Sequence, residues 1–374
     1  MRHGLKQTIV AAFLVLIALP LAANLVGVDG ADPEAENRQL AAFPRLTFSP
    51  PALGSFGTGL AAWFEDHFGF RARLVRWYGE LRLFGLGVSP SNGVLRGRDG
   101  WFFYADDEGV EDYTNANLLT AEEITTWRQQ IVIARNWSRA HRMAYVFTIA
   151  PDKHVVYADK MPDDVQPLRP TSRADQVLNA VSDTGVAVDL RPALFEAKRR
   201  ERIYQRTDTH WNERGAFAAY LQILQAVRAQ QPRVPPAWPR AEFEPIAREV
   251  HGMDLAGMMG LTRVLREEDL RLTPRRQRQA VVVEPPGETP DAEVGRLVTE
   301  IPGSNLPRAV IIRDSFMSAL APFLSEHFSR AVYLWRNDFD PASIEAEHPD
   351  VVIQEIVGRH LYDYVPTPQL IPVN

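Results

Sequence analysis

Short apolar runs alternate with helical patterns along most of the chain, and this alternation constrains the fold more than any other feature. The runs that we expect to form buried strands are Ala144–Ala150, Gly185–Leu190, Ala309–Arg313, Ala331–Trp335 and Asp350–Ile356. Helical patterns cover Ala121–Ala140, the segment after Trp211, and Phe316–Phe328. Continuous apolar runs are typical of strands that are covered on both faces. The sequence therefore predicts an α/β fold with a mainly parallel sheet flanked by helices.

Two stretches depart from this alternation. Between Leu60 and Leu83, apolar and aromatic residues recur at helical spacing, which predicts an amphipathic lid or packing helix interrupted near Gly69. Residues 236–307 carry many proline and arginine residues and show no sustained period. We expect this second stretch to be an irregular insertion near the functional site.

The N-terminus carries an uncharged run, Gln7–Val28, preceded by Arg2 and Lys6. At about 1.5 Å per residue a helix of this length reaches roughly 33 Å, which is enough to cross the hydrocarbon core of a bilayer. The basic end should stay in the cytoplasm, which places the rest of the chain outside. The run predicts a signal anchor over residues 1–28 in the inner membrane, with a periplasmic remainder. The alternatives are a signal peptide cleaved near Ala22–Ala23, which would leave a soluble periplasmic product, and a buried helix of a soluble protein.

The rest of the chain divides into a linker and one large domain. Residues 29–54 are polar and rich in proline, as expected of a tether, and the globular domain is predicted to cover residues 55–374. The formal charge of −6 arises from mixed acidic and basic residues, so no nucleic-acid partner is expected. The absence of cysteine from the sequence excludes disulfides, thiolate nucleophiles and cysteine-based zinc sites.

A first candidate for chemistry is Ser315, in the sequence Asp314-Ser315-Phe316. It follows a predicted strand and precedes a predicted helix, where open α/β sheets bind their ligands. Helix N–H groups beside the hydroxyl would stabilise a tetrahedral oxyanion. Taken alone, the same pattern is more often an ordinary helix N-cap.

A second candidate is the pair Asp208 and His210, which precedes the helical pattern after Trp211. A serine hydroxyl is a weak nucleophile until an imidazole takes its proton, and the imidazole in turn needs a carboxylate to orient it. In an extended segment, side chains two residues apart point the same way, so both would reach one cleft. The alternatives are a helix cap for Asp208, a core imidazole for His210, and a metal site. A single Asp-x-His without further ligands gives a metal little support, and no metal is expected.

These motifs resemble the SGNH-like acetyltransferase domain of the AlgJ/AlgX family of alginate O-acetylation proteins. The resemblance rests on Asp208-Thr209-His210-Trp211 with Gly215-Ala216, followed about a hundred residues later by Asp314-Ser315-Phe316. Further matching stretches, in the same order, are Asp66–Arg71, Gly97–Tyr104, Pro151–Lys153 with Tyr157 and Pro162, and Gly252–Leu255. The similarity covers most of residues 55–362. The N-terminal anchor and single domain make the chain more similar to the AlgJ type.

The resemblance implies an SGNH-hydrolase-like fold with Ser315 as nucleophile, His210 as general base and acid, and Asp208 as the orienting carboxylate. One oxyanion donor would be the Ser315 amide, and a second donor is not identified. Arg313 stands where the family commonly has glycine, which would narrow the approach to that backbone.

Further charged and aromatic residues near predicted strand ends are candidates for substrate contacts. They are Lys153, Trp211, Arg336 and Arg359, together with Glu355 and Trp101. For each charged residue a structural ion pair is an equal alternative, and each tryptophan is more often part of a core.

The sequence therefore predicts an O-acetyltransferase that modifies an exported polysaccharide through an acetyl-serine and needs no cofactor. The family resemblance implies that a multispanning membrane acyltransferase delivers the acetyl group. A carbohydrate acetylesterase with the same triad and a non-catalytic polysaccharide-binding scaffold are the alternatives.

Overall fold

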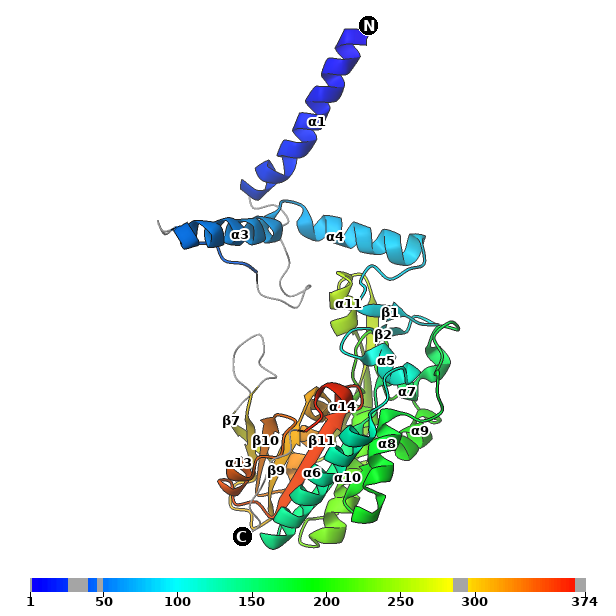
Figure 1. Ribbon diagram of the computed structural model, residues 1–374, viewed down its shortest axis with the longest axis vertical. Coiled ribbons are helices and arrows are strands. Elements are labelled where there is room, and N and C mark those ends of the chain that lie inside the picture. The colour runs from blue at the N-terminus through cyan, green and yellow to red at the C-terminus, as the bar shows by residue number, and fades with distance from the viewer. Residues whose placement is uncertain (1, 26–39, 46–49, 285–294, 367–374) are drawn as a thin grey trace. The chain divides into compact units, whose positions relative to one another are not determined.

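The computed structural model describes residues 2–25, 40–45, 50–284 and 295–366 (Figure 1). The chain forms two compact units, and each is described by itself. The first consists of residues 1–94 with 251–266, and the second of residues 95–250 with 267–374. Most of the predicted linker lies outside the described residues, and a helix already begins at Pro50.

The second unit is built around a mixed sheet. In the described residues this sheet has seven strands in the order β4-β3-β11-β9-β10-β8-β7. The strands are β3 (Ala144–Ala150), β4 (Ala187–Asp189), β7 (Val281–Glu284), β8 (Leu297–Glu300), β9 (Arg308–Arg313), β10 (Arg330–Trp335) and β11 (Val351–Val357). Neighbours from β4 to β10 pair in parallel, whereas β8 is antiparallel to β10 and β7 to β8. The predicted mainly parallel sheet is confirmed.

Helices cover both faces of this sheet (Figure 1). One face packs against α6 (Ala121–Ala140), α8 (Arg173–Ala180), α13 (Pro341–Glu345) and α14 (His360–Asp363). The other face packs against α7 (Lys153–Val156), α9 (Arg191–Lys198), α10 (Glu213–Gln230) and α12 (Ala321–Leu324). A short helix, α5 (Gly109–Thr114), precedes α6, and two-stranded sheets pair β1 (Val94–Arg96) with β2 (Phe102–Tyr104) and β5 (Phe243–His251) with β6 (Arg266–Pro274).

The central strands supply both hydrophobic cores. In β11, Val351 and Ile353 belong to one cluster of buried residues, while Val352 and Ile356 belong to the other. Because successive side chains point to opposite faces of a sheet, a strand buried on both faces must be apolar at nearly every position. This requirement explains why the central strands β3, β9 and β11 were predicted accurately.

Two predictions about this unit were wrong. The helix expected over Phe316–Phe328 is divided into a 3₁₀ turn (Ser315–Ala319), α12 and a second 3₁₀ turn (Ser325–His327). Pro322 lies at the start of α12, where its missing N–H and fixed φ suit a helix beginning and not a helix interior.

The stretch 236–307 is not irregular, because it contains β5, β6, β7 and β8. Strand β8 pairs with β10 and so belongs to the main sheet. Along β6, buried and exposed positions largely alternate, but the buried face includes Glu267 and Asp269. A strand is recognised in a sequence by apolar residues at every second position. In β6 two of those buried positions carry acids, so the alternation of apolar residues is broken and the strand was not predicted.

The first unit consists mainly of helices: α1 (Arg2–Leu25), α3 (Pro50–His67), α4 (Arg71–Glu80), a π-helical turn (Leu81–Gly85) and α11 (Asp254–Met258). In α1, the segment Lys6–Asn24 is long and apolar enough to cross a membrane. The predicted interruption near Gly69 is confirmed, because α3 ends at His67 and Phe70 has a left-handed φ of 65°. A Cβ on Gly69 would lie 2.3 Å from the Pro20 carbonyl oxygen, so the close approach to α1 requires glycine.

Candidate active site

Asp208 and His210 lie in a bend between β-bridge residue Tyr204 and helix α10. The sequence suggested an extended segment, and that prediction is wrong. The chain turns here, because Asp208 Oδ1 accepts a hydrogen bond from the His210 backbone N–H at 2.9 Å. The same oxygen lies 2.8 Å from His210 Nδ1. The Asp208 carboxylate therefore does two things. It closes the bend by its hydrogen bond to the His210 backbone, and it holds the His210 imidazole in place by its contact with Nδ1.

Two buried side chains from elsewhere in the fold hold this bend. Lys153, at the start of α7, places its Nζ 3.1 Å, 3.2 Å and 2.5 Å from the carbonyl oxygens of Gln205, Arg206 and Asp208. Glu267 Oε2 accepts hydrogen bonds from Thr207 N–H at 2.8 Å and from Thr207 Oγ1 at 3.0 Å. Glu267 was missed in the sequence because it lies in the stretch expected to be irregular.

The position of Lys153 gives it a different role from the one expected. Its side chain is only 1% exposed, and its ammonium donates to backbone carbonyls of the bend. A buried ammonium costs several kcal/mol unless hydrogen bonds and charges compensate it, on the order of the ion's desolvation penalty. We therefore assign Lys153 to positioning of the bend and not to substrate contact.

Ser315 follows β9 at the carboxyl end of the sheet, as predicted. Asp314 caps the 3₁₀ turn: its Oδ1 accepts from Phe316 N–H at 2.9 Å and its Oδ2 from Val357 N–H at 2.6 Å. The Phe316 amide is therefore engaged and is not a free oxyanion donor. The Ser315 amide stays a candidate for that role, and the second donor stays unidentified.

The two segments meet side chain to side chain. His210 Nε2 lies 2.8 Å from Ser315 Oγ, which completes a hydrogen-bonded line from Asp208 through His210 to Ser315. Trp211 donates its indole N–H to the Phe316 carbonyl at 2.9 Å, and the Phe316 ring lies 4.9 Å from the His210 ring. Trp211 is 3% exposed, so its ring is not available to stack on a sugar. Its hydrogen bond instead connects the segment of His210 to the segment of Ser315.

The charges at this end of the sheet favour an ionised Asp208. Burial alone would raise the pKa of Asp208, but the hydrogen bond and charge of His210, with a contribution from the Lys153 charge, lower it. Behind Ser315, burial and then the negative charge of Asp314 raise the pKa of Glu355 well above its ordinary value. The Asp314 backbone N–H donates to Glu355 Oε2 at 3.2 Å. Glu355 is thus a buried acid that supports the cap and does not contact the nucleophile.

Both arginines that were predicted to contact substrate, Arg336 and Arg359, form ion pairs with acidic side chains. Arg359 is 6% exposed, with its Nη1 2.5 Å from Asp152 Oδ1 and its Nε 3.3 Å from Asp107 Oδ2. Arg336 lies beyond β10 and contacts Asp338 at 2.7 Å and Asp340 at 2.9 Å. Each guanidinium is held by structural ion pairs, as the alternative interpretation expected.

Two other residues singled out in the sequence are also buried. Trp101 is 5% exposed, and its ring stacks at 4.1 Å on Tyr157. Arg313 is 3% exposed; its guanidinium lies 4.5 Å from the ring of Trp335 and donates to Ser318 Oγ at 2.9 Å. The bulky side chain of Arg313 is therefore directed toward β10.

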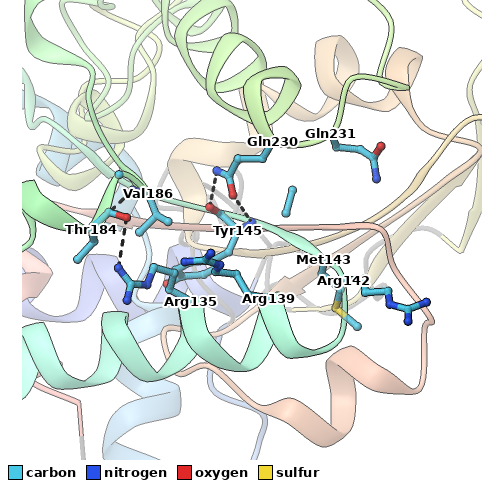
Figure 2. Close-up of a pocket in the computed structure, with 11 residues that line it drawn as sticks. Arg135, Arg139, Arg142, Met143, Tyr145, Thr184, Val186, Gln230 and Gln231 are labelled. Carbon is cyan, nitrogen blue, oxygen red and sulfur yellow. Dashed lines mark hydrogen bonds between the residues drawn. The ribbon is translucent and has the colours of Figure 1, made fainter.

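A cavity of about 440 Å³ lies at the other end of the sheet (Figure 2). Residues near the starts of β3 and β4 line it, among them Tyr145 and Val186, together with Arg135 and Arg139 of α6. The Ser315 hydroxyl follows the end of a parallel strand, so this cavity and the triad lie at opposite ends of the same sheet. A large cavity alone does not identify the site in this fold.

The sequence and the fold are similar to those of known proteins. Residues 94–341, more than half of the chain, match the family described as an SGNH hydrolase-like domain of the acetyltransferase AlgX. A probable alginate O-acetylase AlgJ from Pseudomonas putida is 32% identical over 143 residues, which are 37% of this chain and 34% of the relative. A second AlgJ, from Pseudomonas syringae, is 27% identical over 141 residues, again 37% and 34% of the two chains. The matches thus span about a third of the length of these relatives.

The fold has a solved counterpart in PatB1 of Bacillus cereus. The two structures agree with a TM-score of 0.52 at 16% sequence identity, over 72% of this chain and 96% of PatB1. At this identity the likeness concerns the fold alone.

Proposed function

The chain belongs to the family of SGNH hydrolase-like acetyltransferase domains of the AlgX type, and on that premise we propose that it transfers acetyl groups to hydroxyls of an exported polysaccharide. The observation that carries the proposal is the hydrogen-bonded line of Asp208, His210 and Ser315, with 2.8 Å at both contacts of the imidazole. The names of the AlgJ relatives suggest alginate as the acceptor to test first. The family resemblance further suggests that a multispanning membrane acyltransferase supplies the acetyl group.

In the first half-reaction, Ser315 Oγ attacks the acetyl carbonyl of the donor while its proton moves to His210 Nε2. The charge of Asp208 stabilises the imidazolium, and the Ser315 amide would donate to the tetrahedral oxyanion. Collapse breaks the bond between the acetyl carbon and the donor. His210 returns the proton to the leaving group, and the acetyl group stays on Ser315.

In the second half-reaction, a sugar hydroxyl loses its proton to His210 and attacks the acetyl-serine. The new ester leaves with the polysaccharide, and Ser315 takes the proton back. Water can attack in the same way, so transfer requires a bound and oriented acceptor. That competition separates a transferase from an acetylesterase with the same triad.

The test uses the full chain in lipid nanodiscs with an activated acetyl ester and alginate oligosaccharides. Mass spectrometry should show an acetyl group on Ser315, and addition of the correct acceptor should shorten its lifetime and yield acetylated sugar. Ser315→Ala should lack both products. If no acceptor is acetylated while acetylated polymer is stripped of acetate, the chain is an esterase. If neither reaction occurs when the membrane acyltransferase is present, the scaffold alternative replaces the proposal.

A further inference from the structure

A stripe of large apolar side chains faces solvent along α4 and the π-helical turn that follows it. Leu74, Trp77, Tyr78, Leu81 and Phe84 form this stripe and are 46%, 58%, 53%, 60% and 62% exposed. Their spacing of three and four residues places them on one side of a helix. Solvated apolar residues are common singly, but a contiguous stripe of this kind marks an interaction surface. We call these five residues the α4 apolar face.

The opposite side of the same helix is packed within the first unit. Gly79 and Leu83 are buried, and a Cβ on Gly79 would lie 2.9 Å from Leu261 and 3.1 Å from the Met259 carbonyl oxygen. The helix therefore has one side fixed against its own unit. The side chains of the apolar side stay exposed, and the contact of Tyr78 with Arg82, whose Nη1 donates to the Tyr78 hydroxyl at 3.2 Å, is made one turn further along the same segment.

The end of the candidate membrane-spanning segment lies next to this helix. A Cβ on Gly69, two residues before α4 begins, would lie 2.3 Å from the Pro20 carbonyl oxygen and 2.6 Å from the Ala23 Cβ. Both contacts come from the last turns of the segment Lys6–Asn24, which is long and apolar enough to cross a membrane. The end of a spanning helix lies where hydrocarbon meets the headgroups. Helix α4 consequently starts at the depth of that boundary.

The chemistry of the face and its flanks suits a lipid surface. Trp77 and Tyr78 belong to the residue types that concentrate at membrane interfaces, where the ring is apolar and its polar atom reaches water. Between Arg71 and Val88 the sequence contains four arginines and one acidic residue, Glu80. Arginines beside an apolar helical face attract anionic headgroups. The segment therefore has both the apolar surface and the positive charge by which interfacial helices bind a membrane.

We propose that the α4 apolar face lies in the lipid leaflet on the side of the membrane where α1 ends. The chain is then attached to the bilayer twice, through α1 and through this face. The proposal concerns lipid contact and is independent of acetyl transfer. It commits to lipid because the adjoining helix end already sets the depth of the bilayer boundary.

Site-directed spin labelling of the full chain tests this directly, because the sequence has no native cysteine. Leu74→Cys, Leu81→Cys and Phe84→Cys are labelled one at a time in nanodiscs of phosphatidylglycerol and phosphatidylethanolamine. Gln129→Cys, on the exposed side of α6, is the matched control. All four positions are exposed except for contacts within the helix, so the thermal midpoint should stay close to that of the wild type.

Oxygen concentrates in the bilayer, whereas a water-soluble nickel chelate stays outside it. At the three α4 positions, oxygen should therefore relax the spin label more strongly than the nickel chelate does, and at position 129 the order should reverse. Strong relaxation by nickel at the α4 positions would place the face in water and overturn the proposal. Protection from both reagents would show a protein contact, such as a second copy, and would also overturn it. As an independent measurement, brominated phospholipids should quench part of the tryptophan emission, and Trp77→Phe should abolish that part. Unchanged quenching in Trp77→Phe would contradict insertion of this ring.

Discussion

The two ends of the central sheet differ in what they bury. At the carboxyl end, Asp152, Lys153 and Arg359 are each less than a tenth exposed. At the amino end, the cavity of about 440 Å³ is bordered by Arg139 and Arg142, whose side chains are exposed. A buried charge costs several kcal/mol unless it is paired, on the order of its desolvation penalty, whereas an exposed arginine costs little. The carboxyl end thus carries buried charges that must be held by partners, as Asp152 and Arg359 hold each other, and the amino end does not.

Replacement of the general base should produce the largest effect at the carboxyl end. His210→Ala should lower acetyl transfer by about 10³-fold or more, because no group would take the proton from Ser315 Oγ. Steady-state kinetics with an activated acetyl ester measure the loss. Added imidazole should restore part of the activity in His210→Ala and none in Ser315→Ala, since only the base can be replaced from solution. Near wild-type turnover in His210→Ala would remove the triad assignment.

The orienting carboxylate should matter almost as much. Asp208→Asn should lower turnover by orders of magnitude, because an amide fixes the wrong imidazole tautomer and does not stabilise its charge. The bend should survive, since the asparagine oxygen can still accept from the His210 backbone N–H that now lies 2.9 Å from Asp208 Oδ1. Unchanged far-UV circular dichroism with retained activity would mean that another carboxylate orients His210.

The sequence was sufficient for those parts of the fold and site that depend on local chemistry. Strand β3, Ala144–Ala150, was predicted residue for residue because both of its faces are apolar. The candidates Ser315, His210 and Asp208 were recognised because each lies at a strand end or helix start with a suitable neighbour. What those candidates do in catalysis stays a proposal.

Contacts between distant segments were not predictable in the same way. No spacing rule places Glu267 of β6 under Thr207, since sixty residues separate them and the strand period was hidden by charge. Lys153 looked like a substrate ligand because it follows a strand end. Only the fold shows that its ammonium points to the carbonyl oxygens of Gln205 and Arg206.

The role of Lys153 gives a third test of the carboxyl end. Lys153→Met should lower the free energy of unfolding by about 3 kcal/mol, because buried carbonyl groups lose their donor. Loss of its positive charge should also raise the pKa of Asp208, which is now lowered in part by that charge. The acidic limb of the pH–rate profile should therefore move to higher pH. A purely structural residue would lower activity equally at every pH, and that outcome would contradict a role in positioning and charge.

Glu355 should show a smaller effect, visible mainly as a pH dependence of stability. Its pKa is raised in the folded state, so the folded chain binds the proton more tightly than the unfolded chain. Its contribution to stability is therefore complete at low pH and declines as the pH rises above the ordinary glutamate value of 4.5. Glu355→Gln carries no such proton, so its stability relative to the wild type should increase from pH 4.5 upward. Chemical denaturation at several pH values measures the difference, and a pH-independent difference would mean that folding does not raise the pKa of Glu355.

The smallest effect should come from the amino end, and it decides whether the comparison between the two ends is functional. Arg139→Glu reverses a charge at the border of the cavity but lies on an exposed side of α6, so the free energy of unfolding should change by about 0.5 kcal/mol or less. If all chemistry and acceptor binding take place at the carboxyl end, kcat and KM for an anionic oligosaccharide should stay within about twofold of the wild type, less than 0.5 kcal/mol in transition-state energy. A neutral acceptor of equal length serves as the control. A rise in KM confined to the anionic acceptor would show that the polymer extends over the amino end, because only a charged chain would be repelled by the new carboxylate. The cavity would then be a distant part of the surface that binds the acceptor. The buried charges at the carboxyl end would show where the reaction takes place, but not how far the acceptor-binding surface extends.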